Sequence, residues 1–106
     1  MIYKIDISYK IGGLGSCEET SLYGYEENCC FFLGNNNGYK ILIKSIEEDK
    51  VILEFDKNTK LILPNNSNII EIKKGETLKP FLPITPAPSY QITITDIRKE
   101  QKLYWS

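Results

Sequence analysis

Apolar and polar residues alternate along most of this 106-residue chain. In the first segment, every odd position from Tyr3 to Ile11 is apolar, and every even position from Lys4 to Lys10 is polar. A period of two is the spacing of a β-strand with one buried and one solvated face. The pattern therefore predicts a strand over residues 2–11 that ends at the glycine pair 12–13.

The same period recurs in shorter segments that are separated by turn residues. Residues 39–46 and 50–55 are predicted to form a hairpin around a charged turn at 47–49. Further strands are expected at 60–64 and 68–75, with the sequence PNNSN between them, and at 90–97.

One longer apolar segment, residues 20–33, is expected to be bulged or broken near Gly24. The sequence GNNNG at 34–38 follows it and predicts a turn, because Asn and Gly adopt positive φ at low cost.

These segments amount to about eight short strands without a convincing helix. The fold class expected is all-β, a small antiparallel β-sandwich that is immunoglobulin-like or a partly closed barrel, formed by residues 1–106 as a single domain. The connection at 75–89 is too long for a hairpin, so we expect it to carry the chain from one sheet to the other.

An internal similarity extends the strand prediction to the end of the chain. Residues 39–55 align with residues 90–106 so that Tyr and Ile positions coincide, and a charged turn follows in both copies. The comparison predicts a turn after residue 97 and a final strand at 103–105 that pairs with 90–97.

Charge and composition narrow the range of partners. The net charge is −1 and acids and bases are interleaved, whereas duplex-binding domains usually show a clustered basic excess. No nucleic-acid partner is expected. The N-terminus lacks the apolar run of a signal peptide and no segment is long enough to span a membrane. We expect a cytoplasmic protein with no membrane partner, and the twelve lysines against one arginine suggest a bacterial or phage genome.

The chain contains no histidine. This absence removes Ser-His-Asp and Cys-His catalysis and the usual zinc ligands. The three cysteines lack metal-ligand spacing, and free cysteine is often buried, so Cys17, Cys29 and Cys30 are expected to be small core residues. No cofactor, metal site or catalytic residue is predicted.

Two glutamates, Glu18 and Glu19, precede the apolar segment at 20–33, and a second pair lies within it. Together with Glu26 and Glu27 they are expected to be solvated. A carboxylate-dependent hydrolase is the third functional hypothesis, and it requires a pair of these groups across a cleft.

The predicted protein-binding residues lie on an aromatic and acidic strip and on a proline-rich segment. Alternation turns one face of 29–33 inward and leaves Phe32 on the other face, close to Tyr23 and Tyr25 in sequence. Aromatic residues of this kind are enriched in interfaces. The candidates are Tyr23, Tyr25, Glu26, Glu27, Phe32, Phe81 and Leu82.

These observations favour a non-enzymatic module that binds another protein, such as an inhibitor, an immunity-type factor, a phage accessory protein or an assembly subunit. The acidic strip suits a partner with a basic surface, and self-association through Phe32 is the other outcome considered. The alternative is a small-molecule or nucleotide-binding protein whose site lies between the sheets or at an oligomer interface, with Arg98 or lysines orienting an anionic ligand.

Overall fold

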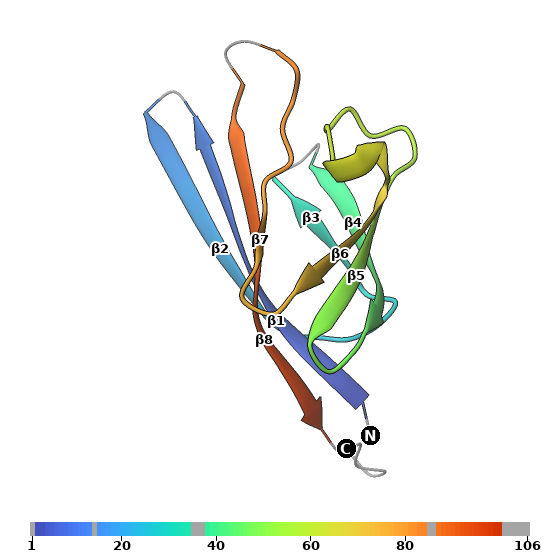
Figure 1. Cartoon of the computed structure of the whole chain (residues 1–106). Coiled ribbons are helices and arrows are strands. Elements are labelled where there is room, and N and C mark those ends of the chain that lie inside the picture. The colour runs from blue at the N-terminus through green and yellow to red at the C-terminus, as the bar shows by residue number, and fades with distance from the viewer. Residues whose placement is uncertain (1, 14, 35–37, 85–86, 101–106) are drawn as a thin grey trace.

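The computed structural model describes residues 2–13, 15–34, 38–84 and 87–100. Within these ranges the chain is a β-sandwich of two antiparallel sheets of four strands each (Figure 1), which confirms the predicted fold class. The described residues include no helix long and apolar enough to cross a membrane. The strands are β1 Ile2–Gly13, β2 Ser16–Tyr25, β3 Cys30–Leu33, β4 Tyr39–Ile46, β5 Lys50–Phe55, β6 Ile69–Lys73, β7 Thr77–Leu78 and β8 Ser89–Glu100.

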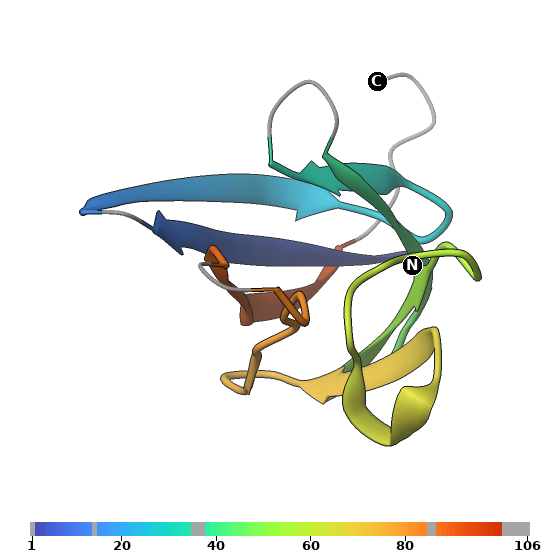
Figure 2. The same cartoon turned by 90° about the horizontal axis from the view of Figure 1, so that it is seen from above.

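The first sheet, sheet A, has the strand order β2-β1-β8-β7. Its centre is the pair of twelve-residue strands β1 and β8, which pair antiparallel from Ile2 opposite Glu100 to Gly12 opposite Ser89, with one shift of register next to Asp6. These long strands extend past the shorter second sheet (Figures 1 and 2), so the molecule measures 50 × 28 × 24 Å.

The second sheet, sheet B, has the order β3-β4-β5-β6 and follows the chain as a simple meander. The predicted hairpin is confirmed: β4 and β5 pair antiparallel, and the N–H of Glu47 donates to the C=O of Lys50 at 2.8 Å. The expected turn at 34–38 lies largely outside the described residues.

The core lies between the two sheets and consists of alternate residues from each strand. On β1 the buried positions are Ile5 and Ile7, and on β8 they are Ile92 and Ile94, as the alternation predicts. Each fully buried side chain of this kind contributes about 1.5–3 kcal/mol relative to exposure. Sheet B supplies Phe31, Leu33, Ile41, Ile43, Ile46, Val51, Leu53, Phe55, Ile70 and Ile72.

The chain passes from sheet B to sheet A earlier than the sequence indicates. A tight turn at residues 73–76, closed by the N–H of Glu76 on the C=O of Lys73 at 3.0 Å, joins β6 to β7. β7 already pairs with β8. The proline-rich residues that follow connect two strands of sheet A rather than the two sheets.

The strand predicted at 60–64 is wrong. Residues 60–64 form no strand beyond a single bridge between Ile62 and Phe81, and a short 3-10 turn, Pro64–Asn66, follows. Proline lacks an N–H for a ladder, and Asn65 and Asn66 have positive φ, which is incompatible with a continuing strand. The irregularity expected near Gly24 in residues 20–33 is confirmed: the register shifts there, and the chain leaves sheet A after Tyr25, so the segment forms two strands in different sheets.

The charged turn predicted after residue 97 is also wrong. β8 continues to Glu100, because β1 supplies a pairing partner along its whole length and the charged side chains of this region form ion pairs. The predicted strand at 103–105 lies outside the described residues.

Both long ladders of sheet A are irregular at Asp6. β1 pairs Ile5 with Tyr25 and then Ile7 with Leu22, and the β8 register shifts next to Asp6 as well. Such bulges increase the local twist. The Asp6 carboxylate stabilises the site by accepting the N–H of Gly24 at 3.0 Å and by pairing with Arg98.

Replacing Asp6 should therefore destabilise the sheet. We expect Asp6→Ala to lower the free energy of unfolding by about 1–3 kcal/mol, because the amide of Gly24 loses its acceptor and Arg98 loses a partner. Urea denaturation measures the loss. Glu48→Ala, in the exposed turn between β4 and β5, is the matched control and should leave the midpoint unchanged; equal midpoints for both variants would contradict this role of Asp6.

Candidate functional site

The predicted aromatic strip is not a single surface. Tyr23 is 72% exposed on β2 of sheet A, and Phe32 is 54% exposed on β3 of sheet B. Tyr25 lies opposite Ile5 and packs against the core instead of sharing an exposed face with Tyr23. The bulge at Gly24, which has φ of 70°, breaks the alternation, and the chain then changes sheet. The structure therefore separates the three aromatic candidates.

The acidic candidates Glu26 and Glu27 lie next to the end of β4, where Glu27 bonds to the backbone. Glu27 accepts the N–H of Ile46 at 2.8 Å, so its carboxylate fixes the end of β4. Glu26 is half-buried, and both residues line a recess of about 390 Å³ with Ile2, Tyr3 and Ile46. Glu18 and Glu19 are exposed on β2, as expected.

The cysteine prediction is wrong. Cys17 and Cys29 are exposed and Cys30 is half-buried, and all three are free thiols. Cys17 faces away from the core on an edge strand, and Cys29 precedes β3 in a turn, so neither position lies in the inter-sheet layer.

The proline-rich segment is anchored at Phe81. Its backbone exchanges two hydrogen bonds with Ile62, at 2.7 and 3.3 Å, while its ring is 53% exposed. Leu82 instead packs against the core, so the two candidates have different surroundings. Pro86 lies outside the described residues.

Arg98 is engaged by carboxylates on the outer face of sheet A. Its guanidinium pairs with Asp6, Asp96 and Glu100, and the hydrogen bond to Asp6, followed by that to Asp96, raises its pKa. Lys74 and Arg98 lower the pKa of Asp96, and Lys4 and Arg98 lower the pKa of Glu100. Three carboxylates already surround the guanidinium, so the predicted role of Arg98 in orienting an anionic ligand has no support here.

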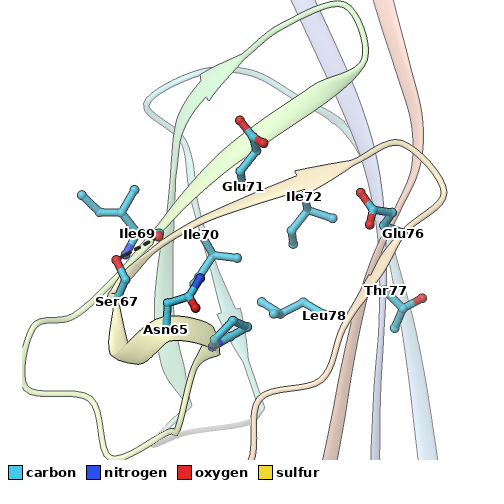
Figure 3. Close-up of a pocket in the computed structure, with 10 residues that line it drawn as sticks. Asn65, Ser67, Ile69, Ile70, Glu71, Ile72, Glu76, Thr77 and Leu78 are labelled. Atoms are coloured by element: carbon cyan, nitrogen blue, oxygen red, sulfur yellow. Dashed lines mark hydrogen bonds between the residues drawn. The ribbon is translucent and has the colours of Figure 1, made fainter.

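A groove lies on the side of the sandwich where β6 and β7 form the edges of the two sheets (Figure 3). Its volume is about 510 Å³, within the range of ligand pockets. Ile70, Ile72 and Leu78 form an apolar floor, each less than a tenth exposed. The other residues that line it are Pro64, Asn65, Ser67, Ile69, Glu71, Glu76 and Thr77.

The register of β6 determines which backbone groups face this groove. The N–H of Phe55 donates to Asn68 and the N–H of Lys74 donates to Asp49. In an antiparallel ladder every second residue pair is hydrogen-bonded. Counting from the two bonded pairs, Ile70 with Leu53 and Ile72 with Val51 are also bonded pairs, so the backbone groups of Ile70 and Ile72 bond to β5. The intervening residues Ile69, Glu71 and Lys73 direct their N–H and C=O groups toward the free edge.

Two of these three edge positions are occupied by the chain itself. The hydroxyl of Ser67 accepts the N–H of Ile69 at 3.2 Å and donates to its C=O at 3.1 Å. The carboxylate of Glu76 accepts the N–H of Lys73 at 3.1 Å, and the N–H of Glu76 donates to the C=O of Lys73.

Glu71 is the exception at the centre of the edge. Its backbone N–H and C=O have no partner among the residues that the structure describes. Its side chain lies on the opposite side of β6 from Ile72 and forms a salt bridge with Lys50 at 2.9 Å (Figure 3). This hydrogen bond and the nearby Glu47 raise the pKa of Lys50. The groove thus contains one open ladder position, meaning the backbone N–H and C=O of Glu71, beside an apolar floor.

This groove is not apparent from the sequence. The alternation in residues 69–73 predicts the strand, and a lone Glu between isoleucines is typical of a strand whose outer face is solvated. Which of its edges is free depends on strand order, which alternation does not contain.

Amide exchange should distinguish the three edge positions. In the native protein we expect the Glu71 amide to exchange faster than those of Ile69 and Lys73, because Glu71 is the one of these three whose N–H lacks an acceptor among the described residues. Glu76→Ala should increase exchange at Lys73 by about tenfold, in line with the loss of one hydrogen bond, and leave Ile69 unchanged. Hydrogen-exchange NMR measures all three, and slow exchange at Glu71 would disprove the open position.

The ion pairs around Arg98 predict that the stability of the fold falls at low pH. Because the folded pKa values of Asp96 and Glu100 lie below their ordinary values of 3.8 and 4.5, their contribution is complete above those values and is lost as pH falls through the lowered folded values. The urea midpoint should therefore fall between pH 6 and pH 2, and it should fall less in Arg98→Gln. The same fall in both proteins would contradict this contribution.

No group of three or more Cys, Asp or Glu residues that could hold a metal ion occurs in the described part of the chain. No protein-family model, curated protein or solved structure matches this chain. The assignment of a function to the groove therefore rests on its geometry.

Proposed function

We propose that the protein is a non-enzymatic binding module that captures an extended segment of a partner protein along the free edge of β6. Addition of a strand to an open sheet edge is a common mode of peptide recognition. Main-chain hydrogen bonds supply affinity in this mode, and pockets for alternate side chains supply specificity. The groove between β6 and β7 combines both elements.

The observation that carries the proposal is the unpaired backbone of Glu71. Backbone N–H and C=O groups are strong hydrogen-bonding groups, and a donor and an acceptor on one residue match one residue of an antiparallel strand. A small molecule rarely offers this complementary pair with apolar groups on both sides. An extended peptide has all of these features in every residue.

The longest edge strand of the sandwich is less suited to pairing. β2 is an edge strand of ten residues, but exposed Glu18 and Glu19 lie on it and a bulge at Gly24 interrupts its register. Charges and bulges on edge strands discourage association. On β6 the chain leaves a single position open next to an apolar floor.

Catalysis has little support at this site. The chain lacks histidine, and the only ionisable side chains among the residues that line the groove are Glu71 and Glu76. Glu76 is engaged by the N–H of Lys73, and Glu71 by Lys50. Both carboxylates act as charged groups at the rim, which supports binding.

A peptide selection tests the proposal directly. A phage-displayed library of random linear peptides is selected on the native protein, and the enriched peptides are measured against Glu71→Pro. Proline is tolerated where the N–H of an edge strand faces outward, so this variant blocks the open position and preserves the β5–β6 ladder. We expect affinity to fall at least tenfold.

Phe32→Pro is the matched control. Phe32 also lies on an edge strand, and the register of β3 directs its N–H away from β4, so the two variants differ in location rather than in kind. Binding should survive in Phe32→Pro. Thermal unfolding confirms that both variants fold. Failure to enrich any peptide, or equal affinity for the native protein and Glu71→Pro, would overturn the proposal.

A further inference from the structure

We infer that the segment bound at β6 has the pattern apolar–basic–apolar, with the basic residue directly opposite Glu71. This inference rests on the proposed function and specifies the chemistry of the partner. It combines the position of the open backbone groups, the charge of the groove and the orientation of the neighbouring side chains.

The open position determines the alignment of the bound segment. One residue of an antiparallel strand donates to the C=O of Glu71 and accepts its N–H, and that residue lies directly opposite Glu71. Ser67 and Glu76 occupy the ladder positions on either side. The contact is therefore centred on a single residue, with one neighbour on each side over the floor.

Charge selects the central residue. Side chains directly opposite each other in an antiparallel pair lie on the same face of the sheet, so the central side chain lies beside the carboxylate of Glu71. Lys50 is shared between Glu71 and Glu47, at 2.9 and 3.4 Å, which leaves these two carboxylates with a single cation. The residues that line the groove include two glutamates and no lysine or arginine.

Lys73 is the nearest other cation on this face of β6. It lies two residues from Glu71, opposite Lys50, and its backbone position is occupied by Glu76. The central residue of the bound segment therefore faces Glu71 and not Lys73. A lysine or arginine at this position completes an opposite-charge cross-strand pair.

The flanking residues must be apolar for a separate reason. Successive side chains of a strand point to opposite faces, so both neighbours of the central residue point toward the inter-sheet layer. There they meet Ile70 and Ile72 of β6 and Leu78 of β7 (Figure 3). Branched apolar side chains such as Val or Ile fit these two positions, since they cover the apolar floor without burying an unpaired polar group.

A second copy of this chain does not satisfy the same requirements. Symmetric pairing of two β6 edges about the open position places Glu71 directly opposite the Glu71 of the other copy. Like charges directly opposite each other destabilise a strand pair. The carboxylate therefore favours a basic strand from another protein over self-association at this edge.

Two synthetic peptides test the inference. Both are acetylated and amidated heptapeptides, Ser-Gly-Val-Lys-Val-Gly-Ser and the same sequence with Glu at the centre. Titration followed by the ¹⁵N–¹H resonances of Ile70 and Ile72, which flank position 71 and keep their amides in every variant, gives both affinities. The Lys peptide should bind the native protein about fivefold more tightly, and Glu71→Gln, which keeps the backbone unchanged, should abolish the preference. Replacing both valines by serine should weaken binding roughly tenfold.

The outcomes separate this inference from the proposed function. Suppose that the Lys and Glu peptides bind the native protein equally and that neither binds Glu71→Pro. This result would overturn the preference for a basic residue and retain strand addition. A preference for Lys that persists in Glu71→Gln would also overturn it. Failure of both peptides to bind, or binding that is unaffected by Glu71→Pro, would overturn strand addition and the inference with it.

Discussion

The tight turn at residues 73–76 is the constraint on which the arrangement of the two sheets depends. Within four residues the chain must end one sheet and begin the other. The N–H of Lys74 donates to Asp49, in the turn just before β5 of sheet B, and the N–H of Gly75 donates to Ile94 in sheet A, at 2.9 and 2.8 Å. Gly75 has φ of 86°, a conformation that costs other residues more. The turn thus holds the two sheets together at the point where they diverge.

The groove is a consequence of this turn. A hairpin in one sheet would have paired β6 with β7 and used the backbone groups of both strands. Because β7 joins β8 instead, no strand formed by the described residues lies next to the outer edge of β6. Natural sandwiches usually protect such edges, and here Ser67 and Glu76 protect the two ends of β6. Glu71, at the centre of this edge, is left unprotected, and the proposed binding of an extended segment accounts for this.

The two outer faces of the sandwich differ in character. On sheet A, Asp6, Asp96 and Glu100 surround Arg98, so the charges are satisfied within the chain. On sheet B, Glu71 shares Lys50 with Glu47 and lies next to an open backbone position. A charged side chain on the first face contributes to the stability of the long ladder. On the second face, we propose that the Glu71 side chain discriminates between partners.

The sequence by itself determined most of the longer strands, since alternation is a local property that each segment carries. It identified the inward positions Ile5, Ile7, Ile92 and Ile94 and the hairpin around residues 47–49, all of which the structure confirms. It also restricted the chemistry, because a chain without histidine has few catalytic options near neutral pH.

Tertiary structure alone decided the rest. The alternation cannot show which strand lies next to which, so the separation of Tyr23 from Phe32 by a change of sheet was invisible in the sequence. The exposure of Cys17 and Cys29 likewise depends on an edge strand and a turn that only the assembled sheets define. The open position at Glu71 has the same origin: hydrogen bonding at an edge depends on the absence of a neighbouring strand, which is a property of the whole fold.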